Sequence, residues 1–423
     1  MAQLTDDCFA FSGPLLPIAE MERLIEAGVA PVAEIEEVAL SAALGRVLAR
    51  DIVAGLALPS FDNSAVDGFA VRHGDLAEAG ETRLAVVDRV AAGAAAARPL
   101  AAGEAIRIFT GAPMPGGADT VFMQEDCRVE GGVVIVPPGL KLGANRRLAG
   151  EDVKKGAVAL PAGRRLAARD IALAAAVGLT ALPVRRRVRV ALFSTGDEIV
   201  EPGTPRGPSA IYDANRYLLA GLLTRLGAEV TDLGIVADDP AALRWALAEA
   251  AAGRDLVLSS GGVSTGEADH MRAALERIGR LVFWRVAIKP GRPVAMGTLP
   301  GGPSGAAAFV GLPGNPAAVF VTFIRVVRPL LLRLAGATAV PLVPLPVRSA
   351  FAYRKKKGRR EYVRVALRQA ADGAIEATKY PQEGAGVITS LTETAGLVEL
   401  LEDRTTVEPG STVGFLAYAA LAD

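Results

Sequence analysis

The sequence has few cysteine, histidine and aromatic residues. Of its 423 residues only two are Cys and two are His, and Phe, Trp and Tyr together make up 5%. Cys8 and Cys127 are too few for a disulfide framework, which is typical of a reducing compartment. His73 and His270 lie too far apart to indicate a local metal motif, and we nominate neither as a base. The composition therefore argues against a disulfide scaffold and a local His or Cys metal site.

The sequence also lacks an excess of one charge and a long apolar run. Lys plus Arg and Asp plus Glu number 46 each, so no global field favours nucleic acid or a membrane surface. The short basic run "RKKKGRREY" has no interleaved stacking aromatics, so we expect no nucleic-acid partner. The longest apolar run, "IALAAAVGLTALPV", is shorter than the roughly 20 residues of a membrane span. The start "MAQLTDDCFA" does not look like a secretory signal, and we expect a soluble, cytoplasmic protein.

The sequence is rich in alternating strand-like and helix-like segments between residues 186 and 336. Runs such as "VRVALFS" and "DLVLSS" predict buried strands. The segments "DANRYLLAGLLTRLGA", with Asp213 as N-cap, and "DPAALRWALAEAAAG" predict helices, and a long last helix should be kinked or broken near Pro329. This order predicts an open parallel or mixed α/β sheet with helices on both faces. Residues 56–145 and the tail hold shorter strand-like pieces, which predict a β-rich unit and a small β-barrel or sandwich.

Five polar turns follow the predicted strands, where ligands bind in such sheets. They are "STGDE", "ADD", "SSGGVSTGEAD", "KPGRP" and "GLPGNP". In the third turn, the Gly and hydroxyl residues suit a phosphate, and its two acids, Glu267 and Asp269, would repel an anion unless Mg²⁺ bridges them to it. The alternative is that the acids favour the helix dipole and the Gly are turn residues.

The other turns carry a similar choice. Glu198 again follows a hydroxyl–Gly turn, and one of Asp238 and Asp239 is expected to be the N-cap before Pro240. Lys289 and Arg292 can hold an oxyanion, though a solvated turn is equally common. The proline turn "GLPGNP" needs no function. The joint occurrence of acids, cations and Gly loops on one edge indicates a site.

Nine motifs follow one another along the chain: "FDNSAVDGFA", "RIFTGAPMPGGAD", "GEDV", "STGDE", "IYDANRYLL", "LGIVADDP", "SSGGVSTGEAD", "FWRVAIKPGRP" and "GLPGNPAAV". In these motifs and their order the chain resembles the molybdopterin molybdotransferases of the MoeA type, which share this module with the gephyrin E domain. The resemblance implies four domains. They are a discontinuous elongated domain (1–55 plus 146–185), an inserted β-rich domain (56–145), a molybdopterin-binding α/β domain (186–336) and a C-terminal β-barrel (337–423).

The resemblance also implies an activity. Similar proteins insert molybdate into adenylylated molybdopterin and release AMP, with Mg²⁺ as cofactor, and are homodimers whose cleft joins the α/β domain of one subunit to the inserted domain of the other. Transient contact with the adenylylating enzyme or with molybdoenzyme maturation proteins is a further expectation. Two alternatives stay open: a molybdopterin adenylyltransferase, disfavoured by the extra domains, and a non-enzymatic scaffold related to gephyrin, disfavoured by the lack of an appended partner domain.

The family's functional positions carry over residue by residue. The acids expected to act in catalysis are Asp67, Glu198, Asp238 and Asp269, and Glu198 and Asp269 are the expected metal ligands. The expected substrate-binding residues are Thr110, Arg147, Ser259, Gly261, Gly262, Ser264, Lys289, Arg292, Pro313, Pro316, Arg359 and Ser390. The sequence departs from the family where Arg292 replaces a frequent Lys, which keeps the charge but changes its geometry.

Overall fold

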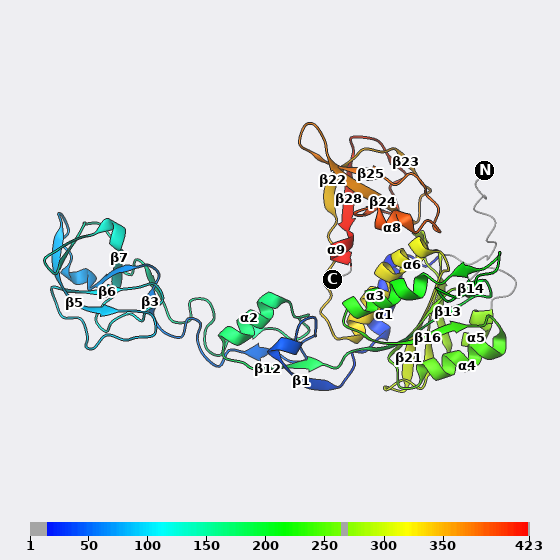
Figure 1. Cartoon of the computed structure of the whole chain (residues 1–423), viewed down its shortest axis with the longest axis horizontal. Coiled ribbons are helices and arrows are strands. Elements are labelled where there is room, and N and C mark those ends of the chain that lie inside the picture. Colours follow the sequence, from blue (N-terminus) through cyan, green and yellow to red (C-terminus); the bar gives the residue numbers. More distant parts are fainter. Residues whose placement is uncertain (1–14, 264–269, 422–423) are drawn as a thin grey trace.

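The computed structural model describes residues 15–263 and 270–421. The molecule is elongated (Figure 1). A β-rich lobe lies at one end, a small unit lies in the middle, and the α/β sheet with the barrel beside it lies at the other end. No helix among the described residues is both long and apolar enough to cross a membrane.

The α/β region is built on an open six-stranded sheet. Its order is β16 (Glu229–Val236), β13 (Arg189–Thr195), β17 (Leu256–Ser260), β21 (Ala306–Leu312), β20 (Pro293–Pro300) and β18 (Arg280–Arg285). The first four strands are parallel, whereas β20 runs antiparallel to β21 and to β18. The start of β20 therefore lies at the edge where the parallel strands end, because Ala295 pairs with Gly311. The predicted mixed sheet is confirmed.

Helices cover both faces of this sheet, as the sequence predicts. One face packs against α1 (Ile18–Gly28), α3 (Asn215–Arg225), α6 (Pro316–Thr322) and α7 (Arg328–Leu334), and the other against α4 (Pro240–Ala251) and α5 (His270–Ile278). Alternate residues of one strand serve the two cores, since Leu258 lies in the first and Val257 in the second.

The helix ends follow the expected local chemistry with one correction. Asp239 is the N-cap of α4, and its Oδ1 accepts from the backbone N–H groups of Ala241 and Ala242 at 2.9 and 3.2 Å. The N-cap of α3 is Ala214 rather than Asp213, although Asp213 Oδ1 still accepts from the N–H of Arg216. The long last helix is broken by a π-helical turn, Phe323–Val327, just before Pro329, because proline has no N–H to donate to the preceding turn.

The β-rich lobe and the middle unit are smaller. The lobe is one sheet in the order β7 (Thr120–Met123), β4 (Gly68–Val71), β6 (Glu104–Ile108), β5 (Thr82–Val90), β9 (Val133–Val136) and β8 (Arg128–Glu130). The middle unit pairs β1 (Ile35–Ala39) with β12 (Ala181–Arg185) and β2 (Ile52–Val53) with β11 (Val158–Leu160), beside α2 (Ala168–Ala176). Short pairs join β3 (Asn63–Ser64) to β10 (Arg146–Arg147), and β14 (Ile199–Val200) to β15 (Ile211–Tyr212). The boundaries between the domains stay a prediction.

The C-terminal unit is a closed five-stranded barrel. Its order is β24 (Arg360–Gln369), β25 (Ile375–Lys379), β22 (Leu345–Ser349), β28 (Thr412–Ala417) and β26 (Gly396–Leu400), and β26 pairs back with β24. The pair β23 (Tyr353–Arg354) and β27 (Thr406–Val407) and the helices α8 (Thr389–Thr392) and α9 (Tyr418–Leu421) complete it. The strand β19 (Ile288–Lys289) leaves the α/β region and pairs with β24, which fixes the barrel beside the sheet edge.

Candidate functional site

Four buried hydroxyl groups lie at the carboxyl ends of two neighbouring strands. Ser194 and Thr195 end β13, and Ser259 and Ser260 end β17, with Ser194 directly opposite Ser260. Each is at most 1% exposed, and none of the four hydroxyl oxygens has a hydrogen-bond partner among the described residues. Because a buried hydroxyl without a partner is unfavourable, this edge is suited to a ligand that supplies hydrogen bonds. We call these hydroxyls, together with Glu198 and Asp238, the strand-end cluster.

The two glycines after β17 allow the chain to pass close to β13. A Cβ on Gly261 would lie 2.1 Å from the carbonyl oxygen of Thr195, and one on Gly262 would lie 2.7 Å from Thr195 Cγ2. Both also have positive φ, +84° and +67°. These steric demands alone explain the glycines, so their contact with substrate stays a prediction.

The structure brings the predicted acids Glu198 and Asp238 together. Asp238 is half-buried, and its Oδ1 has no partner among the described residues. Burial raises the pKa of Asp238, and the nearby negative charges of Asp197, Glu198 and Asp239 raise it further, against an opposing effect of His270. Asp238 is thus a carboxyl group held in an environment that disfavours its charge, which a bound cation would relieve.

The donor set is partly suited to Mg²⁺. The unpartnered Oδ1 of Asp238 beside Glu198 is the kind of oxygen ligand that this ion prefers. Within residues 15–263 and 270–421, no three His, Cys, Asp or Glu side chains gather around one point. Ser264, Glu267 and Asp269 lie outside the described residues, so the predicted metal ligand Asp269 has no structural account.

A second feature, the cation pocket, lies between the sheet edge and the barrel. It has a volume of about 300 Å³ and is bounded by the turn before β20, by the start of α6 and by the barrel. The side chains that carry its chemistry are Lys289, Arg292, Pro313, Asn315, Tyr353, Arg364, Lys379, Tyr380 and Glu383. The predicted residues Lys289, Arg292 and Pro313 therefore share one pocket, to which the barrel contributes two further cations.

A buried carboxylate fixes Lys289 in this place. Pairing of β19 with β24 sets Lys289 opposite Glu361, which is 1% exposed. Lys289 Nζ lies 3.5 Å from Glu361 Oε2, Arg359 Nε donates to Oε1 at 2.6 Å, and the hydroxyl of Tyr353 donates to Oε2 at 2.8 Å. Burial and this carboxylate raise the pKa of Tyr353 far above its usual value. Arg359 is not among the residues that line the pocket, but it shares the carboxylate of Glu361 with Lys289, which does line it.

Sequence reasoning missed the two barrel cations, Arg364 and Lys379. Arg364 is 6% exposed and donates to the carbonyl oxygens of Gln382, Glu383 and Gly384 at 3.1, 2.9 and 3.2 Å. Lys379 ends β25 and forms an ion pair with Glu383. The local signal was weak, because both lie in ordinary strands without a turn motif.

The remaining predicted residues are not among those that line the cation pocket. In the β-rich lobe, the backbone N–H and the hydroxyl of Thr110 both donate to Asp67 Oδ1 at 2.8 Å, and these bonds lower the pKa of Asp67. Arg147 is exposed in β10, which pairs with β3, and β3 is labelled at the β-rich lobe, at the opposite end of the molecule from the α/β sheet (Figure 1). Pro316 is the first residue of α6, and Ser390 is buried in α8, where its hydroxyl donates to the carbonyl of Val387.

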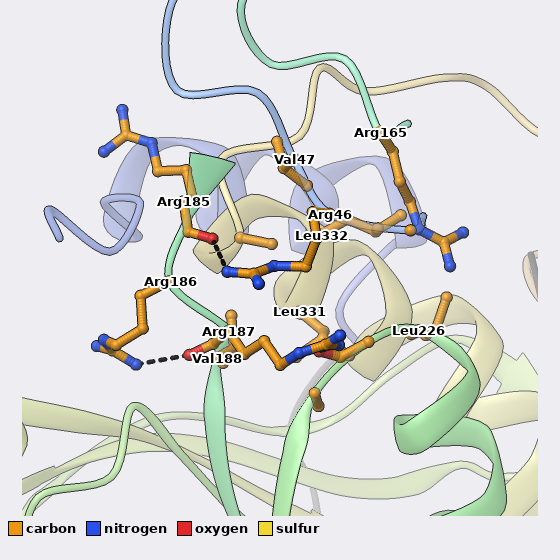
Figure 2. Close-up of a pocket in the computed structure, with 14 residues that line it drawn as sticks. Arg46, Val47, Arg165, Arg185, Arg186, Arg187, Val188, Leu226, Leu331 and Leu332 are labelled. Carbon is orange, nitrogen blue, oxygen red and sulfur yellow. Dashed lines mark hydrogen bonds between the residues drawn. The ribbon is translucent and has the colours of Figure 1, made fainter. Parts of the chain in front are cut away.

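A second group of cations, the arginine junction, lies where the middle unit meets the α/β region. It comprises Arg46, Arg165, Arg185, Arg186 and Arg187, around a cavity of about 20 Å³. Figure 2 shows Arg46 donating to the carbonyl oxygen of Arg185 and Arg186 to that of Arg187. Arg186 also forms a buried ion pair with Asp255 at 2.8 Å. These guanidinium groups hold chain segments together and leave little room for a ligand.

Comparisons with known proteins agree with this architecture. Residues 16–178 match the MoeA N-terminal region (domain I and II), residues 191–333 match the family described as "Probable molybdopterin binding domain", and residues 346–418 match the MoeA C-terminal region (domain IV).

Named relatives and solved structures cover most of the chain. A molybdopterin molybdenumtransferase of Haemophilus influenzae is 38% identical, over 88% of this chain and 91% of the relative. A molybdopterin molybdenumtransferase of Nostoc is 40% identical, over 89% of this chain and 87% of the relative. A crystal structure of the molybdopterin biosynthesis MoeA protein of Pyrococcus horikoshii is 31% identical with a TM-score of 0.73, and covers 96% of this chain and 99% of its own. With this sequence, fold and domain order, the chain belongs to the molybdopterin molybdenumtransferase (MoeA) family.

Proposed function

We propose that this protein is a transferase of molybdenum cofactor biosynthesis that inserts the metal of molybdate into molybdopterin. We further propose that it accepts the pterin as its adenylylated form and releases AMP. One observation carries the proposal: a single sheet edge holds both the cation pocket and a cluster of buried hydroxyls, beside which lie the acids Asp238 and Glu198. A dianion such as molybdate and a phosphate ester would therefore be bound side by side.

The cation pocket is the proposed site of molybdate. Lys289 and Arg292 stand on a turn of the α/β region, and Lys379 and Arg364 face the same volume from the barrel. Positive groups in a partly enclosed pocket bind an oxyanion more strongly than the same groups in bulk water, because the effective dielectric constant is lower. These residues would bind and orient molybdate for its transfer to the pterin.

The strand-end cluster is the proposed site of the phosphate groups. The hydroxyls of Ser194 and Ser259 would donate to phosphate oxygens, and Asp238 and Glu198 would hold Mg²⁺. When bound, Mg²⁺ acts as a Lewis acid that neutralises negative charge on the phosphates. Asp238 is the residue whose buried, unpartnered oxygen makes this assignment specific.

Replacing Asp238 by Asn should separate activity from stability. Its raised pKa means that the folded protein disfavours the negative charge of this group, so an uncharged amide should not destabilise the protein. AMP release should slow about 100-fold, the scale of losing one electrostatic contact in an active site. In the unsubstituted protein the rate of AMP release should fall as the pH falls through the raised pKa of Asp238, and the pH profile of AMP release measures this. Glu249→Gln, which removes a carboxylate on the exposed side of α4, is the matched control variant.

The site proposed here also needs a second copy of the chain. Asp67 and Thr110 lie in the lobe at the far end of the molecule from the strand-end cluster (Figure 1), so a partner subunit would bring them to it. Asp67→Ala and Asp238→Ala proteins should each be inactive, while a refolded equal mixture should regain about a quarter of the activity, since half the dimers would contain one intact site of two. A mixture that stays inactive would contradict the shared site.

One reconstitution tests the function itself. Purified protein is incubated with adenylylated molybdopterin and molybdate, and AMP and active cofactor are measured, the latter by activation of a cofactor-free molybdoenzyme. Both should appear, and both should require molybdate. Formation of adenylylated molybdopterin from ATP and molybdopterin would instead identify an adenylyltransferase, and absence of either reaction would support the scaffold.

A further inference from the structure

We propose that Lys379 binds molybdate from the barrel side of the cation pocket. In the absence of molybdate, Glu383 forms an ion pair with Lys379, and molybdate displaces the Glu383 carboxylate when it binds. This inference rests on the proposed function, because it takes the cation pocket as the molybdate site. It goes further by naming a binding residue and a competing carboxylate that lie outside every motif of the family resemblance.

The placement of Lys379 supports a role in binding. It is the last residue of β25, at the rim of the barrel, and lines the pocket together with Lys289 and Arg292. Its side chain is 24% exposed, and its Nζ lies 5.7 Å from the centroid of the Tyr353 ring. A cation over an aromatic face is attracted to it, so the ring favours a position of the ammonium group in the pocket rather than in solvent.

The loop that carries Glu383, the ion-pair partner of Lys379, is held in place by Arg364. Glu383 is half-exposed and pairs with Lys379, and its backbone carbonyl accepts from Arg364. Arg364 thus fixes the loop that carries Glu383, independently of the charge on the Glu383 side chain. Removing that charge should leave the loop in place and free Lys379 for an anion.

The two members of this ion pair should have opposite effects on anion binding. Lys379→Met removes a cation from the pocket and should weaken molybdate binding. Glu383→Gln removes a competing negative charge and should strengthen it. A purely structural ion pair would give the same sign for both substitutions, because either change breaks the same contact.

The experiment titrates sodium molybdate into the purified full-length protein and its variants by calorimetry at constant ionic strength. We expect about tenfold weaker binding for Lys379→Met, the scale of one lost charge-assisted contact, and a several-fold gain for Glu383→Gln. The KM for molybdate should follow the same two directions, with a smaller change in kcat. If both substitutions changed molybdate affinity in the same direction, or if neither changed it, the inference would be overturned.

The barrel supplies a matched control pair. Lys357 and Asp403 form an exposed ion pair, 3.7 Å from Nζ to Oδ1, outside the pocket. Lys357→Met and Asp403→Asn change the net charge by the same amounts as the test variants and should leave molybdate affinity unchanged. An equal effect of the control pair would mean that net charge, not Lys379, is responsible, and would also overturn the inference.

Lys289→Met separates this inference from the proposed function. If Lys289→Met weakens binding and Lys379→Met does not, the pocket is the molybdate site and only the role of Lys379 is wrong. If neither weakens binding, the assignment of molybdate to the pocket fails, and the inference fails with it.

Discussion

The arginine junction and the cation pocket both gather positive side chains between two units of the molecule, yet they are built for different purposes. At the junction the guanidinium groups surround only about 20 Å³ and donate to backbone carbonyls and to the buried Asp255. At the pocket, cations from two units surround about 300 Å³, and the Lys289 side chain is 47% exposed. The number of cations does not identify an anion site. What identifies it is open volume next to cations that a ligand can reach.

Arg186→Met should have the largest effect and should act on stability. Arg186 and Asp255 are each 6% exposed, and the substitution leaves the buried carboxylate of Asp255 without its charged partner, with the backbone N–H of Arg189 still donating to it at 2.7 Å. The free energy of unfolding should fall by about 3–5 kcal/mol, as for other broken buried ion pairs. Denaturant unfolding checks this, and molybdate affinity of the folded fraction should be unchanged. A loss of molybdate affinity in Arg186→Met, with an unchanged free energy of unfolding, would contradict this distinction between the arginine junction and the cation pocket.

Arg364→Met should reduce both stability and molybdate binding, because Arg364 is buried and also lines the pocket. Loss of its hydrogen bonds to three carbonyl oxygens should lower the free energy of unfolding by about 1–3 kcal/mol. Molybdate binding should weaken as well, because the pocket loses one of the cations that line it. Unfolding and calorimetric titration of the same preparation measure both effects.

Arg292→Met should affect binding far more than stability. Arg292 is only partly buried and stands on the turn before β20 at the pocket. We expect about tenfold weaker molybdate binding, one charge-assisted contact, and a change in unfolding free energy below about 1 kcal/mol. Arg292→Lys, which retains the charge, should recover most of the affinity.

Arg187→Met should have the smallest effect. Arg187 is exposed and donates to the carbonyl of Gly227 at 2.9 Å, a contact at the surface of the junction. Its loss should cost less than about 1 kcal/mol of unfolding free energy and should not change molybdate affinity. A large effect on affinity would show that the junction also binds the anion.

Several parts of the site follow from local sequence. Polar turns after alternating strands and helices placed Glu198, Asp238 and Lys289 at one edge, because parallel strands all end on the same side of a sheet. Asp239 as the cap of α4 follows from its position before Pro240. Arg364 and Lys379 could not be found in this way, since strand periodicity shows which face a residue occupies but not which other domain that face meets.

The sequence alone determined the open α/β sheet, its covering helices, the polar edge and the barrel tail, because these depend on periodicities and turn residues within a few positions of one another. Tertiary structure decided which cations hold chain segments together and which surround open volume. It did so through pairing of β19 with β24, which sets Lys289 against Glu361, 72 positions later in the chain. The physical reason is that such pairs form between groups that are close in space, whatever their separation along the chain, whereas sequence periodicity reflects only neighbours within a few positions.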